Sequence, residues 1–264
     1  VRIDGQEPMH IGGLYGYCID RSRMIDILAT RVLELGGRVE HERTVEDPAE
    51  LDADLVVAAD GIGSRLRAAH AETFRPAVAT GRNYYAWLGT PKVFEAFTFA
   101  FQRTDAGWIW AYGYPSSGST STFIVECSPS TWTGLGLDRM ESEAGLRLVA
   151  DLFADVLSGE PVLGPTAWQR FTEIRNATWR AGNLVLAGDA AHTTHFGIGS
   201  GTVLAVQDAL ALADALGGVS TKGAGLSTAL AAYDRRRRAA LESIQCVAQR
   251  SMGWFEDVDR HLAA

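Results

Sequence analysis

Cysteine is scarce in this sequence, which also has no long apolar run and no excess of positive charge. The 264 residues contain three cysteines that are far apart and form no CxxC pair, so we expect free thiols in a reducing, cytoplasmic environment. No apolar run approaches the ~20 residues that span a bilayer, so we expect no membrane-spanning helix. Positive charge is outnumbered, and the net charge of −8 argues against an extended nucleic-acid-binding surface.

The start of the sequence lacks both an initiator methionine and a basic-then-apolar signal segment. We therefore expect the sequence, which opens at Val1, to begin partway through a longer protein. What is present fits a globular protein with a full core, because 47% of the residues are hydrophobic and 21% are charged. Glycine is abundant, at 28 residues, and much of it lies in two clusters that follow apolar runs.

The first part of the sequence alternates between helical and strand-like patterns. Apolar residues at helical spacing predict a helix over residues 21–35, with Asp20 as its N-cap. A short strand is expected at residues 38–40. The apolar run 55–59 predicts a buried parallel strand that ends in a ligand-facing turn.

The pattern changes between residues 84 and 127. Aromatic and β-branched segments separated by Gly, Pro, Ser and Asp predict an antiparallel sheet inserted between two α/β pieces. Further along, a helical period covers residues 140–157, a second buried strand is expected at 184–187, and a helix at 203–216. A polar loop at 217–227 and one or two helices at 226–262 complete the prediction. We divide the chain into 1–75, 76–170 and 171–264.

The first glycine cluster lies in the segment DLVVAADGIGSRLR, residues 54–67. Here a buried strand delivers Asp60 and Gly61 to its carboxyl end, where α/β sheets place ligands. Arg67 can pair with a phosphate or with Asp60. The alternative is a strand-to-helix turn in which the same residues serve only the backbone, and the segment taken alone does not separate the two.

The second glycine cluster follows the strand 184–187 and is more specific. The strand ends in Gly188 and Asp189, whose carboxylate can accept hydrogen bonds from a sugar or polyol hydroxyl. A glycine-rich run then opens a helix whose free N–H groups suit a phosphate or an electron-rich ring edge. The residues of this opening that we expect to contact a ligand are Gly199, Ser200, Gly201 and Thr202.

Together these segments resemble the single-component FAD-dependent aromatic hydroxylases, the para-hydroxybenzoate hydroxylase class. The resemblance runs over most of the chain and is carried by GYCIDRSRMIDIL, DLVVAADGIGSRLR, NYYAWLGTPKVFEAFTFAF, TSTFIVEC, GDAAHTTHFGIGSGT and RSMGWFEDV. Within the class it is nearer to the salicylyl-CoA and anthraniloyl-CoA hydroxylases and to the tryptophan-derivative hydroxylases of violacein biosynthesis. The fold implied is α/β (α+β): a Rossmann-like three-layer FAD/NAD(P)-binding domain with an inserted, mostly antiparallel substrate sheet and C-terminal helices.

The resemblance also implies roles for individual residues. Asp60 would contact the pyrophosphate region of FAD, Asp189 the ribityl chain and phosphate, and Arg21 the cofactor. The neighbouring Gly61, Arg67 and Gly188 belong to the same cofactor site, and His195 or Phe196 would face the flavin edge.

Two departures from the class stand out. No GxGxxG follows a strand near residue 1, so we expect a hydroxylase whose N-terminal FAD-binding segment is missing from this sequence. The expected partner is a second copy of the chain in a homodimer, or a separate chain that supplies the segment. Phe196 also stands near the point where most of the class has a proline, a form shared with the CoA-ester and violacein relatives.

The reaction implied is hydroxylation of an aromatic substrate, either an aryl-CoA thioester or a tryptophan- or indole-derived compound. NADH or NADPH would reduce FAD, and O₂ would add at the flavin C4a position to give the hydroperoxide that transfers one oxygen. Two alternatives stay open. One is an FAD-dependent dehydrogenase or reductase without oxygen insertion, and the other is a non-catalytic remnant that acts as an interaction module.

Three weaker patterns have structural alternatives. His192 and His195 with Asp189 have helical spacing for a metal site, but no further ligand completes it and we expect none. The run 235–238 of four arginines is interpreted as a solvated helix face. On the predicted sheet, Trp108, Trp110 and Tyr114 share one face and, with Trp87, are candidates for binding an aromatic substrate. Ordinary core packing explains these aromatic residues equally well.

Overall fold

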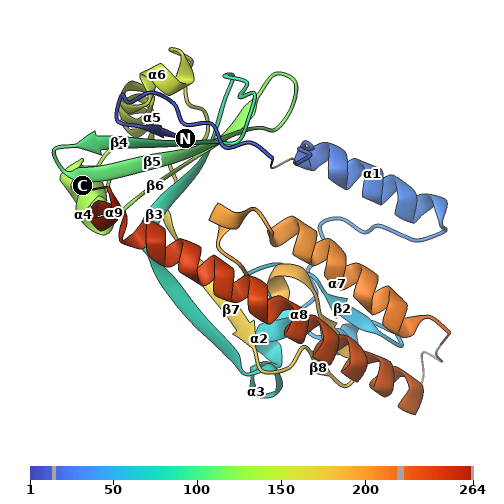
Figure 1. Cartoon of the computed structure of the whole chain (residues 1–264). Helices are drawn as coiled ribbons and strands as arrows, with labels where there is room; N and C mark the ends of the chain where they lie inside the picture. The colour runs from blue at the N-terminus through green and yellow to red at the C-terminus, as the bar shows by residue number, and fades with distance from the viewer. Residues whose placement is uncertain (14–15, 219–222, 263–264) are drawn as a thin grey trace. The chain divides into compact units, whose positions relative to one another are not determined.

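The computed structural model describes residues 1–13, 16–218 and 223–262, and the chain forms two compact units (Figure 1). Unit 1 comprises Val1–Glu42, Arg82–Phe171 and Val258–Ala264, and unit 2 comprises Arg43–Gly81 and Thr172–Asp257. Each unit has its own hydrophobic core. These units are defined by spatial proximity, whereas the division into 1–75, 76–170 and 171–264 is a functional one and stays a prediction.

Most of unit 1 is built on a sheet with the strand order β1-β4-β5-β6-β3-β7, of which residues 76–81 of β3 and 172–176 of β7 belong to unit 2. The strands are β1 (Arg2–Ile3), β3 (Pro76–Thr90), β4 (Thr98–Thr104), β5 (Gly107–Pro115), β6 (Ser121–Cys127) and β7 (Gln169–Asn176). The pairs β4–β5, β5–β6 and β6–β3 are antiparallel, as the alternating sequence predicts. The expected antiparallel insertion over residues 84–127 is therefore present, and β1 adds to it in parallel.

One face of this sheet carries the core of unit 1. Alternate residues of β5 and β6, including Phe123 and Cys127, are fully buried there and share a core with Val149, Leu157 and Phe153 from the helical region. The helices nearby are α4 (Pro129–Gly134), α5 (Ser142–Leu152) and α6 (Ala154–Leu157). The helical period predicted for 140–157 thus forms two helices, broken at Phe153.

Unit 2 contains a three-stranded sheet with the order β2-β9-β8. β2 (Val56–Ala58) is parallel to β9 (Leu184–Leu186), and β8 (Arg180–Ala181) pairs antiparallel with β9. The helices of this unit are α2 (Arg65–Ala69), α3 (Ala71–Phe74), α7 (Gly201–Leu216) and α8 (Ala224–Glu256). Short 3-10 turns occur at Pro48–Glu50, Gly188–Ala190 and Phe196–Ile198.

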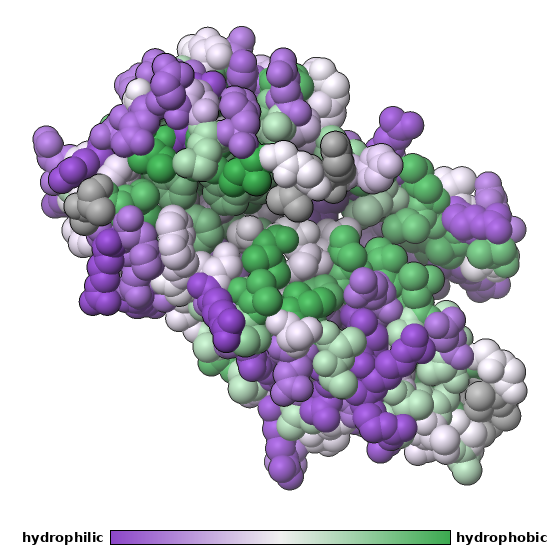
Figure 2. All heavy atoms as spheres, viewed as in Figure 1, coloured by the Kyte–Doolittle hydropathy of each residue, from purple (hydrophilic) through white to green (hydrophobic). Residues whose placement is uncertain are grey.

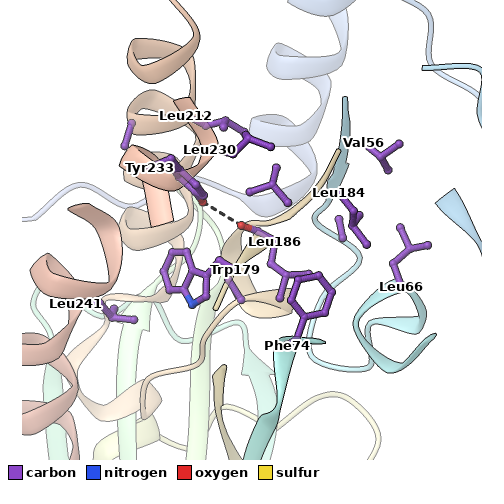
Figure 3. Packing of buried hydrophobic residues seen from close by; sticks show 14 of the residues in the cluster. Val56, Leu66, Phe74, Trp179, Leu184, Leu186, Leu212, Leu230, Tyr233 and Leu241 are labelled. Carbon is purple, nitrogen blue, oxygen red and sulfur yellow. Dashed lines mark hydrogen bonds between the residues drawn. The ribbon is translucent and has the colours of Figure 1, made fainter. Parts of the chain in front are cut away.

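The core of unit 2 joins the sheet to α7 and α8 (Figure 3). Leu184 and Leu186 are buried between strand and helix side chains, and the hydroxyl of Tyr233 donates a hydrogen bond to the carbonyl of Leu186 at 3.0 Å. Trp179 is also almost completely buried. Every residue of β9 is buried, which explains why this strand is a continuous apolar run in the sequence and does not alternate.

Helix α1 (Arg21–Glu34) confirms the helix predicted at 21–35. The Asp20 carboxylate caps it by accepting from the amide of Arg23 at 3.1 Å. Its apolar side chains are not buried: Ile25 and Leu28 are 54% and 56% exposed, and apolar surface is visible at this helix in Figure 2. The amphipathic pattern therefore predicts the helix correctly but does not identify what covers it.

Other expectations differ from the structure in detail. Residues 38–40 form no strand, because no described strand pairs with them and an isolated three-residue segment has no ladder to stabilise it. The C-terminal helix begins at Ala224, inside the expected loop 217–227, of which residues 219–222 lie outside the described part. The expected one or two helices beyond it are α8 and α9 (Val258–His261). Strand β7 was not predicted.

In the part of the chain that the structure describes, no helix is long and apolar enough to cross a membrane.

We predict that Phe123→Ala lowers the free energy of unfolding by about 3–5 kcal/mol, because a fully buried ring leaves a cavity. Phe123 packs edge-on against Phe153 at 5.6 Å and stacks on Phe94 at 6.1 Å. Urea unfolding followed by circular dichroism measures the change. Phe97→Ala, at a 50% exposed site directly before β4, is the matched control and should cost much less. Equal costs would contradict the assignment of this core.

Candidate functional site

The strand ends at Asp60-Gly61 and Gly188-Asp189 meet at one edge of the unit 2 sheet. Because β2 and β9 are parallel neighbours, with Val57 paired to Val185, their carboxyl ends lie side by side. The amide of Ala187 donates to the carbonyl of Ala58 at 3.0 Å, just before both chains turn. The carboxyl edge of a parallel sheet is where α/β proteins bind ligands, so this edge is the candidate site.

Asp60 and Arg67 hold the first of these turns. The Asp60 carboxylate is exposed and accepts a hydrogen bond from the amide of Arg65 at 2.9 Å, at the start of α2. The Arg67 guanidinium is buried and donates to the carbonyl of Ala190 at 3.0 Å and to that of Ile62. Burial lowers the pKa of Arg67, and the Asp60 carboxylate opposes this. Arg67 thus ties the two turns together through backbone carbonyls.

The second turn depends on a carboxylate that sequence analysis did not single out. Asp208 of α7 is completely buried and accepts hydrogen bonds from the amide of Gly188 at 2.9 Å, from His192 Nε2 at 2.8 Å and from Arg237 Nε at 2.7 Å. Burial alone would raise the pKa of Asp208, but these partners hold it below its ordinary value. Trp179 stacks on the His192 ring at 5.0 Å and closes the cluster.

This cluster corrects one expectation and bears on another. Arg237 is buried against Asp208, so the run 235–238 is not simply a solvated face. Arg238 pairs with Asp234 at 2.8 Å, and Arg236 stays exposed. Since Asp208 uses His192, that ring is a structural hydrogen-bonding group. Among the described residues, no group of three His, Cys, Asp or Glu side chains could hold a metal ion.

Gly188 and Gly199 have backbone angles that other residues rarely adopt. Their φ values are +58° and +62°, and a Cβ on Gly188 would also lie 3.4 Å from the Ala205 side chain. These angles expose Asp189 at the strand end and direct the chain into α7. These two glycines therefore shape the backbone between β9 and α7, beside the candidate site.

The N-terminus of α7 has no side-chain cap. Ser200 precedes it, but its hydroxyl lies 2.9 Å from Thr194 Oγ1 instead of turning back on the helix. The first amides of the helix, at Gly201 and Thr202, are left for another acceptor, and Gly199 and Thr202 are exposed. An uncapped N-terminus of a 16-residue helix suits a phosphate or another anionic group.

His195 and Phe196 lie between the strand end and α7. His195 is buried, its Nδ1 accepts from the amide of Gly197 at 3.2 Å, and its ring lies 4.2 Å from that of Phe196. Burial lowers the pKa of His195 to about 4, so the ring is neutral at pH 7. Phe196 is half-buried. Arg21 begins α1 in unit 1, and its side chain is exposed.

The aromatic candidates lie in unit 1, on the sheet face opposite the Phe123 core. Trp108 and Trp110 are buried, Tyr114 is half-buried and stacks on Phe97 at 5.2 Å, and Trp87 is 49% exposed. These four positions therefore range from fully buried to half-exposed.

Sequence analysis missed Tyr112 and Glu126 on this face. Strand alternation places Tyr112 between Trp110 and Tyr114, and its hydroxyl donates to Glu126 Oε2 at 2.7 Å. A strict count of every second residue along β5 would have identified Tyr112. Glu126 gives no such signal, because a single acidic residue in a strand usually faces water.

An α/β sheet whose strand ends meet an uncapped helix N-terminus, in a chain that also carries an antiparallel sheet, defines a dinucleotide-binding class of protein. The model of the family described as FAD binding domain matches residues 34–248. The chain belongs to this family, and both the predicted fold class and the predicted resemblance are confirmed.

The curated relatives include the salicyloyl-CoA 5-hydroxylase of Streptomyces sp, which is 38% identical over 99% of this chain and 52% of its own length. The protodeoxyviolaceinate monooxygenase of Chromobacterium violaceum is 32% identical over 92% of this chain and 65% of its own length. The chain thus spans between about half and two thirds of the length of these relatives.

Solved structures share the fold. A 2-methyl-3-hydroxypyridine-5-carboxylic acid oxygenase superposes with a TM-score of 0.70 at 17% identity, covering 89% of this chain and 67% of the other. HpxO of Klebsiella pneumoniae, solved with FAD and uric acid, superposes with a TM-score of 0.58 at 20% identity, over 79% of this chain and 53% of the other.

We predict that Asp208→Asn lowers the free energy of unfolding by about 3–5 kcal/mol at pH 7, because it leaves Arg237 buried without its anionic partner. Urea unfolding measures this. The control is Asp214→Asn: Asp214 lies 3.9 Å from Arg236, both side chains are 70% exposed, and we expect a cost below ~1 kcal/mol.

The same pair of proteins makes a pH test. The pKa of Asp208 is lower in the folded than in the unfolded state, so its contribution is complete above the unfolded value of ~3.9 and is lost as the pH falls through the folded value. The stability gap between wild type and Asp208→Asn should therefore narrow in acid. A gap that stays constant from pH 7 to pH 3 would contradict the pairing.

Proposed function

We propose that this protein is an FAD-dependent monooxygenase that hydroxylates an aromatic substrate with NADH or NADPH and O₂. The observation that supports it best is the meeting of the strand ends at Asp60 and Asp189 beside the uncapped N-terminus of α7. Exposed carboxylates and free helix amides at one edge match the hydroxyls and phosphates of a dinucleotide. The names of the relatives support aromatic oxygenation as the reaction.

The residues present at this edge fit FAD. Asp60 would lie at the pyrophosphate region and Asp189 at the ribityl chain, while Gly61 and Gly188 let the backbone approach closely. The opening of α7 at Gly199, Ser200, Gly201 and Thr202 would receive a phosphate or the flavin edge. Arg21, which begins α1 in unit 1, is proposed as a cofactor contact from the resemblance alone. FAD, when bound, supplies the redox chemistry: it takes electrons from the nicotinamide and activates O₂.

The chain's own side chains position the two turns and set the charge beside the site. Arg67 and Asp208 fix the two turns by hydrogen bonds to the backbone carbonyl of Ala190 and the backbone amide of Gly188. His195 is neutral at pH 7 and places no charge beside the cofactor. The aromatic face of unit 1, with Trp87, Trp108, Trp110 and Tyr114, would orient an aromatic ring.

For the substrate, the relatives support an aryl-CoA thioester or a tryptophan- or indole-derived compound. An FAD-dependent reductase without oxygen insertion is the alternative enzyme, and an interaction module is the alternative outside catalysis. Three measurements on the purified full-length protein separate them. The oxygenase is yellow and releases flavin on denaturation, consumes NAD(P)H faster with an aromatic ligand, and transfers ¹⁸O from ¹⁸O₂ into the product.

Each alternative predicts a different outcome. A reductase binds flavin and consumes NAD(P)H but gives an unlabelled ligand. An interaction module contains no flavin at all.

We predict that Asp189→Ala weakens FAD binding about ten- to a hundredfold, the effect of losing one charged hydrogen-bonding group worth ~1.5–3 kcal/mol. Because the Asp189 side chain is exposed, the free energy of unfolding of the apoprotein should stay unchanged. Titration of apoprotein with FAD, followed by flavin fluorescence, gives the affinity. Asp52→Ala is the control: Asp52 is exposed in the same unit but precedes β2 at the other end of the strand. Unaltered flavin affinity in Asp189→Ala would sink the assignment.

A second prediction concerns the aromatic face. Trp87→Ala should reduce the stimulation of NAD(P)H oxidation by an aromatic ligand while leaving FAD affinity and stability unchanged, because the Trp87 side chain is half-exposed. Trp110→Ala should instead destabilise unit 1, because that ring is completely buried. Stopped-flow reduction and thermal unfolding measure the two effects. Equal loss of ligand stimulation and FAD binding in Trp87→Ala would indicate that Trp87 stabilises the fold and does not bind the aromatic ligand.

A further inference from the structure

Polar atoms gather at one end of the aromatic face of unit 1. Glu126 of β6 is 1% exposed, and both of its oxygens accept hydrogen bonds. Oε1 accepts from Asn83 Nδ2 at 2.8 Å, and Oε2 accepts from the Tyr112 hydroxyl at 2.7 Å and from Trp110 Nε1 at 3.3 Å. A carboxyl group is thus held rigidly inside a face that is otherwise aromatic.

One atom of this group has no donor. The Asn83 side chain is 6% exposed, and its Oδ1 is buried without a hydrogen bond from any described residue. The bond from Nδ2 to Glu126 fixes the orientation of the amide, because the reverse orientation would set two acceptors against each other. Buried polar atoms are almost always hydrogen-bonded, so the unmatched Oδ1 points to a donor that the described residues do not supply.

Exposure rises along β3 away from this atom. Every second residue of β3 lies on this face, namely Asn83, Tyr85 and Trp87. The first is buried, the second is half-buried and the third is 49% exposed. The register confirms the face, because Tyr85 is opposite Glu126 and Trp87 is opposite Ile124. A flat ring lying along Tyr85 and Trp87 would have one end at Asn83 and the other toward solvent.

We propose that Asn83 Oδ1 accepts a hydrogen bond from a hydroxyl or amino group on the ring of the aromatic substrate, and that Glu126 positions Asn83 for it. The carboxyl-derived end of the substrate then points toward Trp87, because a carboxylate or thioester carries no proton to donate to Asn83. This inference rests on the proposed function and adds to it the polar group that the substrate carries and the direction in which it binds.

The test compares ligands that carry a ring hydroxyl able to donate a hydrogen bond with ligands that lack that donor. The probes are N-acetylcysteamine thioesters of 2-, 3- and 4-hydroxybenzoic acid, the matching methoxybenzoic acids and benzoic acid. Affinities for the FAD-loaded protein are measured by quenching of tryptophan fluorescence. We expect at least one hydroxybenzoyl probe to bind about three- to tenfold more tightly than both its methoxy counterpart and the benzoyl probe, the effect of one neutral hydrogen bond. In Asn83→Leu that preference should disappear.

Two further variants keep the test decisive. Gln102→Leu removes an amide from β4, where Gln102 pairs with Ile109 on the opposite face, and should retain the wild-type preference. Asn83→Ala should lose the preference as Asn83→Leu does, and replaces it if the leucine variant does not fold. A wild type without preference, in which a water would serve Asn83, overturns the proposal, as does a preference that survives in Asn83→Leu. Absence of flavin or of ¹⁸O transfer contradicts the proposed function separately.

Discussion

The buried carboxylate of Asp208 is the interaction on which unit 2 depends. It joins three segments that are far apart in the sequence: α7, the turn that holds Gly188 and His192, and α8 through the guanidinium of Arg237. A buried charge is costly unless it is paired and hydrogen-bonded, and here three donors satisfy it. The strand end, the glycine-rich turn and the two long helices therefore have one common point of attachment, and the candidate FAD site is built beside it.

The two faces of the unit 1 sheet have different roles. One face, with Phe123 and Phe153, is apolar and gives the unit its stability. The other combines aromatic rings with the polar group of Glu126, Tyr112 and Asn83. Strand alternation allows both in the same strands, since neighbouring residues of β5 and β6 point to opposite sides.

Much of this could be predicted from the sequence where the signal is local. The apolar runs before Asp60 and Asp189 predict both strand ends, and Asp20 predicts the start of α1, because each pattern lies within a few residues. Asp208 could not be found in this way: its partners are 16 to 29 residues away, and a single Asp on an apolar helix usually faces solvent. The strand expected at 38–40 failed for the converse reason, since a strand needs a partner that local sequence does not reveal.

The position of Cys127 has a consequence for the chemistry that the protein tolerates. This thiol lies in the core of unit 1, and its burial, together with the nearby carboxylate of Glu126, raises its pKa well above the usual range. The thiolate is the form that reacts with peroxides, so the buried Cys127 stays inert toward them. Cys18 and Cys246 are exposed, so oxidative damage and alkylating reagents should reach them first and leave the sheet intact.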